Sequence, residues 1–101
     1  MTHSKAALAV LVSLKPLPGK LDEVLEMTRG VFAKIRASEE TCIFLAAHVD
    51  PAGENVMLYE LWSDRETFNE FVQRPDMAEY LSDLDTRLES RSVDQWIRTR
   101  A

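Results

Sequence analysis

Apolar residues recur along the chain with two periods, one typical of strands and one typical of helices. Residues 6–15 are largely apolar on both sides of a period-2 alternation, as in a strand covered on both faces. Pro16 and Pro18 end this strand, because proline cannot donate to a sheet ladder. Residues 20–37 then show the spacing of a single helical face. The apolar positions of that face are Leu21, Val24, Leu25, Val31, Phe32 and Ile35, with Thr28 completing the stripe.

Two further strands are predicted by runs rich in β-branched and aromatic residues. They cover residues 41–50 and 55–62, and the Pro-Ala-Gly-Glu sequence between them has the composition of a hairpin turn. Alternation along the first of the two places Cys42, Phe44 and Ala46 on one side.

The second half of the chain predicts two helical segments and a last strand. Ser63 to Glu66 has the pattern of a capping box, in which Ser63 caps the helix and the Glu66 side chain reaches back. This helix buries Phe68, Phe71 and Val72 and ends near Pro75. The next segment has Met77, Tyr80, Leu81, Leu84 and Leu88 at helical spacing. Residues 92–99 form the last strand, with Val93, Gln95, Ile97 and Thr99 on one side and Asp94, Trp96 and Arg98 on the other.

The order of these elements predicts an α+β fold. It is the ferredoxin-like βαββαβ arrangement, with a four-stranded antiparallel sheet covered by helices on one face. A length of 101 residues allows one domain, residues 1–101. The uncovered face carries more apolar surface than a soluble monomer normally exposes, which predicts a homodimer of two sheets paired across a two-fold axis. A monomer with a small apolar patch is the alternative.

Composition and charge exclude several classes of partner. The net charge of −5 disfavours nucleic acid, since binding the phosphate backbone requires clustered lysine and arginine. The N-terminal apolar run is too short to span a membrane and no signal-peptide cleavage site follows it. Cys42 is the only cysteine, which suits the reducing cytoplasm. No histidine and cysteine spacing indicates a metal site, and no glycine-rich loop indicates a dinucleotide cofactor.

The Tyr-Glu-Leu-Trp stretch at residues 59–62 precedes a helix start, and a Pro-Gly-Lys turn at residues 18–20 follows the first strand. In this order and spacing the chain, from about residue 6 to 98, resembles the antibiotic biosynthesis monooxygenase (ABM) family. The resemblance implies a dimeric α+β barrel with a pocket between sheet and helices in each subunit. Some members of this family oxidise phenols or quinols with molecular oxygen and need neither flavin nor metal.

The resemblance therefore implies a cofactor-independent monooxygenase acting on a small aromatic or quinol-like substrate. The alternative is a non-catalytic dimeric module that binds a small molecule on the same fold. Many family members have histidines where this chain has Phe71 and Asp76, which is the observation behind that alternative. The branch that degrades haem has a tryptophan and a histidine where this chain has Phe71 and Leu81, so haem degradation is not expected.

Proton abstraction from a phenol needs a base, and two residues are candidates. His48 is one, because histidine is a common general base, although a histidine at a strand end is also common as a half-exposed residue. Glu60 is more informative, because glutamate is unusual in the middle of a strand and a buried charge is costly unless it is paired. It is either a base with a raised pKa or a structural partner for Arg98 or another cation.

Four more residues are candidates for substrate binding. Trp62 shares a strand side with Glu60 and is either core filler or a pocket wall. Phe71 and Tyr80 lie on the helices that would cover the pocket, and Tyr80 can donate a hydrogen bond unless it only fills the core. Asp76 has either a polar role in the pocket or the role of a helix cap.

Overall fold

A computed structural model of the chain describes residues 6–99 and confirms the predicted order of elements. The elements are β1 (Leu8–Pro16), α1 (Leu21–Ser38), β2 (Cys42–Val49), β3 (Val56–Trp62), α2 (Arg65–Val72), α3 (Pro75–Asp85) and β4 (Leu88–Ile97). The strands form one antiparallel sheet in the order β2-β3-β1-β4. This is the ferredoxin-like α+β fold.

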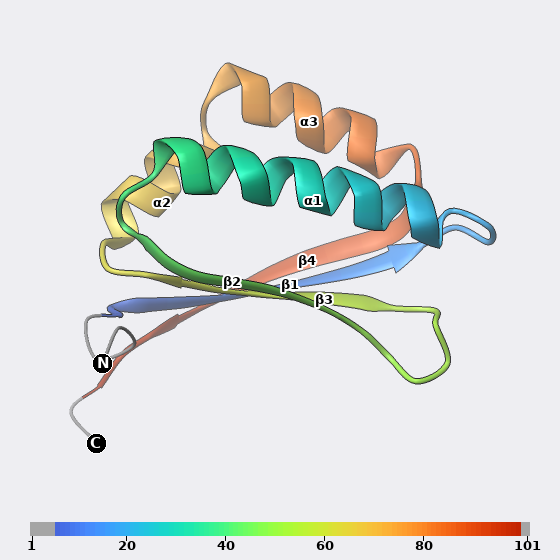
Figure 1. Cartoon of the computed structure of the whole chain (residues 1–101), viewed down its shortest axis with the longest axis horizontal. Helices are drawn as coiled ribbons and strands as arrows, with labels where there is room; N and C mark the ends of the chain where they lie inside the picture. The colour runs from blue at the N-terminus through green and yellow to red at the C-terminus, as the bar shows by residue number, and fades with distance from the viewer. Residues whose placement is uncertain (1–5, 100–101) are drawn as a thin grey trace.

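All three helices lie on one face of the sheet (Figure 1). The central strand β1 sends Leu8, Val10 and Leu14 into the layer between sheet and helices, where each is buried. Thr28 is buried in the apolar stripe of α1, and its hydroxyl donates to the carbonyl of Val24 at 2.9 Å. A polar residue is tolerated there because its hydrogen bond is satisfied within the helix.

A bulge in β2 corrects the predicted faces of that strand. Cys42 pairs with Trp62, but the next registered pair is Phe44 with Leu61, so Ile43 is an extra residue. A bulge of this kind reverses the side on which the following residues lie. Cys42 packs against the core under the helices and Phe44 lies on the uncovered face, so the prediction that they share a side is wrong.

The predicted capping box is also wrong by one residue. Asp64, not Ser63, caps α2, and its carboxylate accepts from the backbone N–H of Glu66 at 3.1 Å and from the Thr67 hydroxyl at 2.6 Å. Ser63 is occupied elsewhere, because its backbone N–H and its hydroxyl both donate to the carbonyl of Thr41. Both residue types cap helices well, and the tertiary contact of Ser63 decides between them.

The last strand begins four residues earlier than predicted. Helix α3 ends at Asp85, and Leu88 pairs with Pro16 at the start of β4 instead of extending the helix. The apolar side chain of Leu88 is buried in either arrangement, so helical spacing alone could not exclude it from α3. The predicted sides of β4 are confirmed for Val93, Gln95 and Ile97, which pair with the helix-facing residues of β1.

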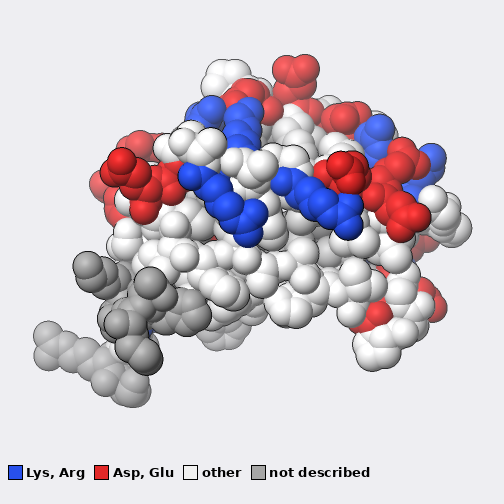
Figure 2. All heavy atoms as spheres, viewed as in Figure 1, with Lys and Arg blue, Asp and Glu red and all other residues white. Residues whose placement is uncertain are grey.

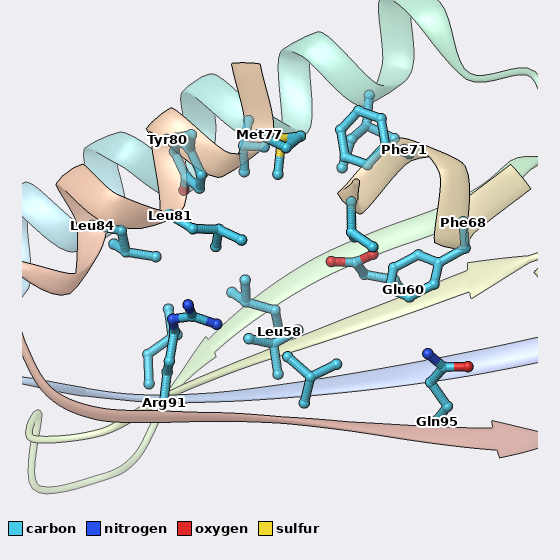
Figure 3. A pocket seen from close by; sticks show the side chains of 16 residues that line it. Leu58, Glu60, Phe68, Phe71, Met77, Tyr80, Leu81, Leu84, Arg91 and Gln95 are labelled. Carbon is cyan, nitrogen blue, oxygen red and sulfur yellow. The ribbon is translucent and has the colours of Figure 1, made fainter. Parts of the chain in front are cut away.

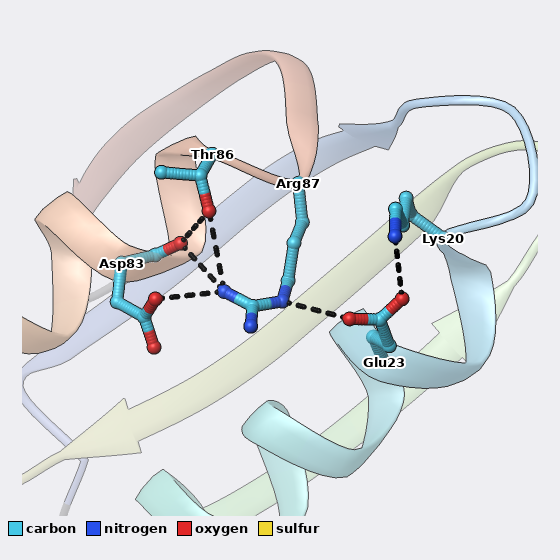
Figure 4. A network of polar contacts seen from close by, with 5 residues as sticks. All are labelled: Lys20, Glu23, Asp83, Thr86 and Arg87. Carbon is cyan, nitrogen blue, oxygen red and sulfur yellow. Dashed lines mark hydrogen bonds and ion pairs between the residues drawn. The ribbon is translucent and has the colours of Figure 1, made fainter.

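A network of polar contacts joins the start of α1 to the end of α3 (Figure 4). The Arg87 guanidinium donates to Glu23 at 3.1 Å and to Asp83 at 2.8 Å, and Lys20 donates to the other oxygen of Glu23 at 2.9 Å. Thr86 accepts a further bond from Arg87 at 3.2 Å. These contacts hold α1 and α3 together at one end of the helical layer.

The uncovered face of the sheet exposes several large apolar side chains. Phe44, Met57 and Trp96 lie on it with exposed fractions of 37%, 37% and 61%, which is unusual for side chains of this size. Figure 2 shows that the charged residues gather over the helices, whereas the band along the sheet below them is largely uncharged. The apolar surface that the alternation of β1 predicts on this side is therefore present.

Candidate functional site

A cavity of about 320 Å³ lies between the sheet and the helices. All three helices and strands β1, β3 and β4 contribute side chains to it (Figure 3). Most of the lining is apolar and includes two phenyl rings, Phe68 and Phe71. Its polar side chains are Glu60, Tyr80, Arg91 and Gln95. An apolar chamber with a few polar groups is the usual form of a small-molecule site.

Glu60 is the one carboxylate that lines this cavity. It lies in the middle of β3, where its pairing with Val10 and Leu45 directs it to the helical side of the sheet, and it is 7% exposed. The indole Nε1–H of Trp62 donates to its Oε1 at 3.0 Å. No arginine or lysine among residues 6–99 forms a salt bridge with it.

Burial raises the pKa of Glu60 above its ordinary value, and the hydrogen bond from Trp62 offsets that effect only in part. The prediction of a structural ion pair with Arg98 is wrong, because Arg98 follows the end of β4 on the opposite side of the sheet. A buried carboxyl with a raised pKa and no cationic partner is a common feature of functional sites.

Trp62 forms the wall behind Glu60. Its side chain is fully buried, with the ring centroids of Phe68 and Phe71 at 5.3 Å and 5.9 Å from its own. The contact with Phe68 is edge-to-face, the arrangement that aromatic rings prefer. Trp62 is therefore a core residue, and it also supplies a hydrogen bond that orients the Glu60 carboxyl. Phe71 lies between Trp62 and the cavity. As predicted, Phe71 lines the cavity.

Tyr80 lines the cavity from α3, but its hydroxyl is already used. The O–H donates to the backbone carbonyl of Met27 in α1 at 3.2 Å. Burial, with the nearby Glu60 charge as a smaller contribution, raises the pKa of Tyr80 to about 12. Tyr80 therefore stays protonated at neutral pH and acts as a wall and a link between helices, with its oxygen still able to accept a hydrogen bond.

Besides Trp62, two more of the predicted site residues are absent from the cavity lining. His48 pairs with Met57 in the β2–β3 ladder and points to the uncovered face, so it does not meet Glu60. Asp76 lies in the first turn of α3, where it pairs with Lys34 and accepts from Arg74 at 2.9 and 3.1 Å. Arg74 occupies the cap position and Pro75 the first helical position, so the prediction that Asp76 caps the helix is wrong.

The sequence interpretation missed Arg91 and Gln95, which reach the cavity from β4. Arg91 was outside the predicted strand, although its spacing from Val93 and Gln95 is that of one strand face. Gln95 accepts from Arg65 at 3.0 Å and donates to Asn69 at 3.4 Å, which joins β4 to α2. A strand start at Leu88 would have placed Arg91 on the face that Gln95 was already predicted to share with Val93.

The thiol of Cys42 is not a candidate nucleophile. Burial raises its pKa to about 11, so it is protonated at neutral pH. Within residues 6–99, no three histidine, cysteine or acidic side chains are grouped so that they could hold a metal ion. None of the helices in that range is long and apolar enough to cross a membrane.

Comparison with known proteins gives a family and a fold. The family model described as antibiotic biosynthesis monooxygenase matches residues 7–83. A conserved protein from Methanosarcina mazei is 17% identical with a TM-score of 0.83, over 96% of this chain and 97% of its own. A candidate antibiotic biosynthesis monooxygenase from Deinococcus radiodurans is 10% identical with a TM-score of 0.83, over 93% of this chain and 94% of its own. No curated protein matches the sequence.

Proposed function

Because the chain belongs to the antibiotic biosynthesis monooxygenase family, we propose that it oxidises a small phenol or quinol with molecular oxygen inside the cavity. Glu60 carries the proposal. It is a buried carboxyl without a cationic partner in the described chain, it faces an apolar chamber, and Trp62 holds one of its oxygens. A carboxyl in that position suits proton transfer to and from a bound hydroxyl group.

In the proposed mechanism the ionised Glu60 removes the hydroxyl proton of the substrate. The resulting phenolate is electron-rich and can reduce oxygen directly. Phe68 and Phe71 stack against or beside the ring, and the apolar walls keep water from the reactive intermediate. The raised pKa of Glu60 makes it a stronger base than an exposed carboxylate, so the proton transfer to it is more favourable.

The electrons for this reaction come from the substrate. A phenol and one oxygen molecule give a quinone and one water, and a quinol gives a hydroxyquinone and water in the same ratio. One oxygen atom enters the ring and the other leaves as water, and the four electrons that oxygen accepts are those that the ring loses. The reaction balances without an external reductant, which is why we propose that it proceeds without a cofactor.

Oxygen consumption tests the proposal. A panel of quinols and anthrones is supplied to the purified protein in an oxygen electrode, and the quinone product is followed by its absorbance. We expect at least one compound to consume oxygen well above its spontaneous rate, with one quinone formed for each oxygen molecule. Uptake at the spontaneous rate across the panel would contradict the proposal.

A non-catalytic binding module is the second candidate. It is favoured by Phe71, which stands where many family members have a histidine and which fills part of the cavity with an apolar ring. On this reading a phenol binds beside Glu60 but is not oxidised. Calorimetric binding without oxygen uptake would support this candidate over the first.

We further propose that the protein is a homodimer that works in the cytoplasm, where the free thiol of Cys42 would stay reduced. Family members are typically dimers that bind small molecules. The exposed Phe44, Met57 and Trp96 on one sheet face support the pairing of two sheets by that face. A two-fold axis would cover the same apolar residues on both copies.

Trp96→Lys is expected to weaken or abolish the dimer. It places a charge on the proposed contact face, and this charge would have to be desolvated on association. Sedimentation velocity over a range of concentrations measures the outcome. Ala33→Lys adds the same charge to the exposed side of α1 and should leave the dimer unchanged. A wild-type protein that sediments as a monomer at high concentration would contradict the dimer.

A further inference from the structure

A second polar group faces the cavity at a distance from Glu60. Arg91 pairs with Leu14 of β1, whereas Glu60 pairs with Val10. The two residues are thus separated by two strand spacings across the sheet and four residues along it, roughly 16 Å between their Cα atoms. Figure 3 shows the Glu60 carboxyl and the Arg91 guanidinium directed into the same space from different strands.

The Arg91 guanidinium is held in place but not saturated. Its Nε–H donates to Asp85 Oδ1 at 2.6 Å and its Nη2 donates to Oδ2 at 3.3 Å. The side chain is 32% exposed. Arginine has five N–H donors, and the remaining three have no partner within residues 6–99. A guanidinium anchored on one edge offers its other donors to a carboxylate in the forked geometry that such pairs favour.

The other polar groups of the cavity, which carry no charge, already form hydrogen bonds within the protein. The Tyr80 hydroxyl donates to Met27, and the amide of Gln95 bonds to Arg65 and Asn69. Between Glu60 and Arg91 the lining is apolar, with Leu58, Leu84 and Val93 among its members. The two ionisable groups with unused hydrogen-bonding capacity therefore lie at two ends of an apolar chamber. Glu60, at one end, is an acceptor or a proton donor, and Arg91, at the other, is a cation.

We propose that the cavity selects a hydroxyaryl carboxylate, with its hydroxyl group on Glu60 and its carboxylate on Arg91. This inference rests on the proposed function, because it assigns the substrate class of the same cavity. The span between the two ends, once the two side chains are subtracted, suits a scaffold of one or two fused aromatic rings. Arg91 acts as a specificity-determining residue, since it contacts the substrate at the end remote from the reacting hydroxyl.

Binding of matched naphthalenes tests the inference. Calorimetry under anaerobic conditions separates binding from turnover, with 6-hydroxy-2-naphthoate, its methyl ester and 2-naphthol as probes. We expect the acid to bind about tenfold or more tightly than either neutral compound. Arg91→Gln should remove this preference and leave the affinity for 2-naphthol unchanged. Asp85→Asn removes a competing negative charge but keeps an acceptor oxygen for the guanidinium, so it should increase the preference.

Lys15→Gln is the matched control. Lys15 follows Leu14, the partner of Arg91, but lies on the opposite side of β1, where it pairs with Glu89 at 3.4 Å. The Lys15→Gln variant loses one positive charge close to Arg91, but the substitution does not touch the cavity. This variant should bind all three probes as the wild type does. Equal affinity of the wild type for the acid and its ester, or an equal loss for all probes in Arg91→Gln, would overturn the inference.

The two proposals can fail separately. Tight binding of the acid that depends on Arg91 but leads to no oxygen uptake with any hydroxyaryl carboxylate supports the inference and contradicts the oxygenase function. Oxygen uptake with neutral quinols at a rate that Arg91→Gln does not change, with no preference for acids, supports the oxygenase function and overturns the inference.

Discussion

Glu60→Gln is expected to lower kcat/KM for quinol oxidation by about 100- to 10,000-fold, the usual contribution of a positioned general base. The amide keeps the size of the side chain and can still accept the indole N–H of Trp62, so the cavity should retain its shape. What it loses is the ability to take up the hydroxyl proton. Initial rates of oxygen uptake with the best quinol of the panel measure the effect. Glu70→Gln makes the same change on the exposed side of α2 and should have wild-type activity. A Glu60→Gln variant within a few-fold of the wild type would exclude Glu60 as the base.

The pKa of Glu60 also fixes the direction of the pH dependence. A base must be ionised in the free protein, so kcat/KM should rise with pH on an acid limb that lies above the ordinary pKa of glutamate. Stability should change in the opposite direction. Because the folded pKa is raised, the native state binds more protons than the unfolded state between the two pKa values of Glu60. Stability therefore falls as pH rises from the unfolded pKa through the folded pKa. Glu60→Gln should remove this loss, so urea denaturation should find the variant more stable than the wild type at about pH 8 but not at about pH 4. Equal effects at both pH values would contradict a raised pKa.

Trp62→Ala is expected to destabilise the protein by about 3–5 kcal/mol, the usual cost of removing a fully buried large aromatic side chain. The indole is fully buried and contacts both Phe68 and Phe71, and it is the hydrogen-bond donor to Glu60. Its loss leaves a cavity in the core and a buried carboxyl with no donor. For a domain with a total stability of about 5–15 kcal/mol, this is a large fraction. Urea denaturation followed by circular dichroism measures it.

Trp62→Phe separates the two contributions of the indole. It keeps an aromatic ring in the wall and deletes the Nε1–H, so the loss of stability should be smaller than for alanine. The acid limb of kcat/KM should move to higher pH, because the hydrogen bond that lowers the pKa of Glu60 is gone. A Trp62→Ala variant as stable as the wild type would show that this residue is not part of the core.

The order of the elements could be derived from the sequence because each periodic pattern is local. Residues 6–15 alternate as a strand that is apolar on both sides, and the stripe from Leu21 to Ile35 is apolar on one helical face. Such segments can bury their apolar side chains only in a layered arrangement. In the βαββαβ order the helices cover one face of the sheet and leave the other uncovered. Glu60 also stood out in the sequence, because burying a carboxylate in the middle of a strand is costly unless the charge is paired. Its burial, and its place in the cavity beside Phe71 and Tyr80, agree with that reading.

Details that depend on contacts between distant segments could not be derived in this way. Ser63 and Asp64 are both good helix caps. Because Ser63 donates to the carbonyl of Thr41, Asp64 is the residue that caps α2. Leu88 suits a helix or a strand, and its pairing with Pro16 decides for the strand. The bulge at Ile43 changes which residues of β2 face the helices, and the alternation along the strand gives no sign of it.

The sequence by itself determined the fold, the apolar sheet face and the unusual carboxylate at residue 60. Only the tertiary structure decided which side chains share a cavity with that carboxylate. His48 and Glu60 lie on neighbouring strands, but the register between those strands turns them to opposite faces of the sheet. The register of β4 on β1 brings Arg91, which is distant in sequence, to the side of the sheet that Glu60 faces. Register is set by the sum of many backbone hydrogen bonds and packing contacts between strands, and a single segment does not contain that information.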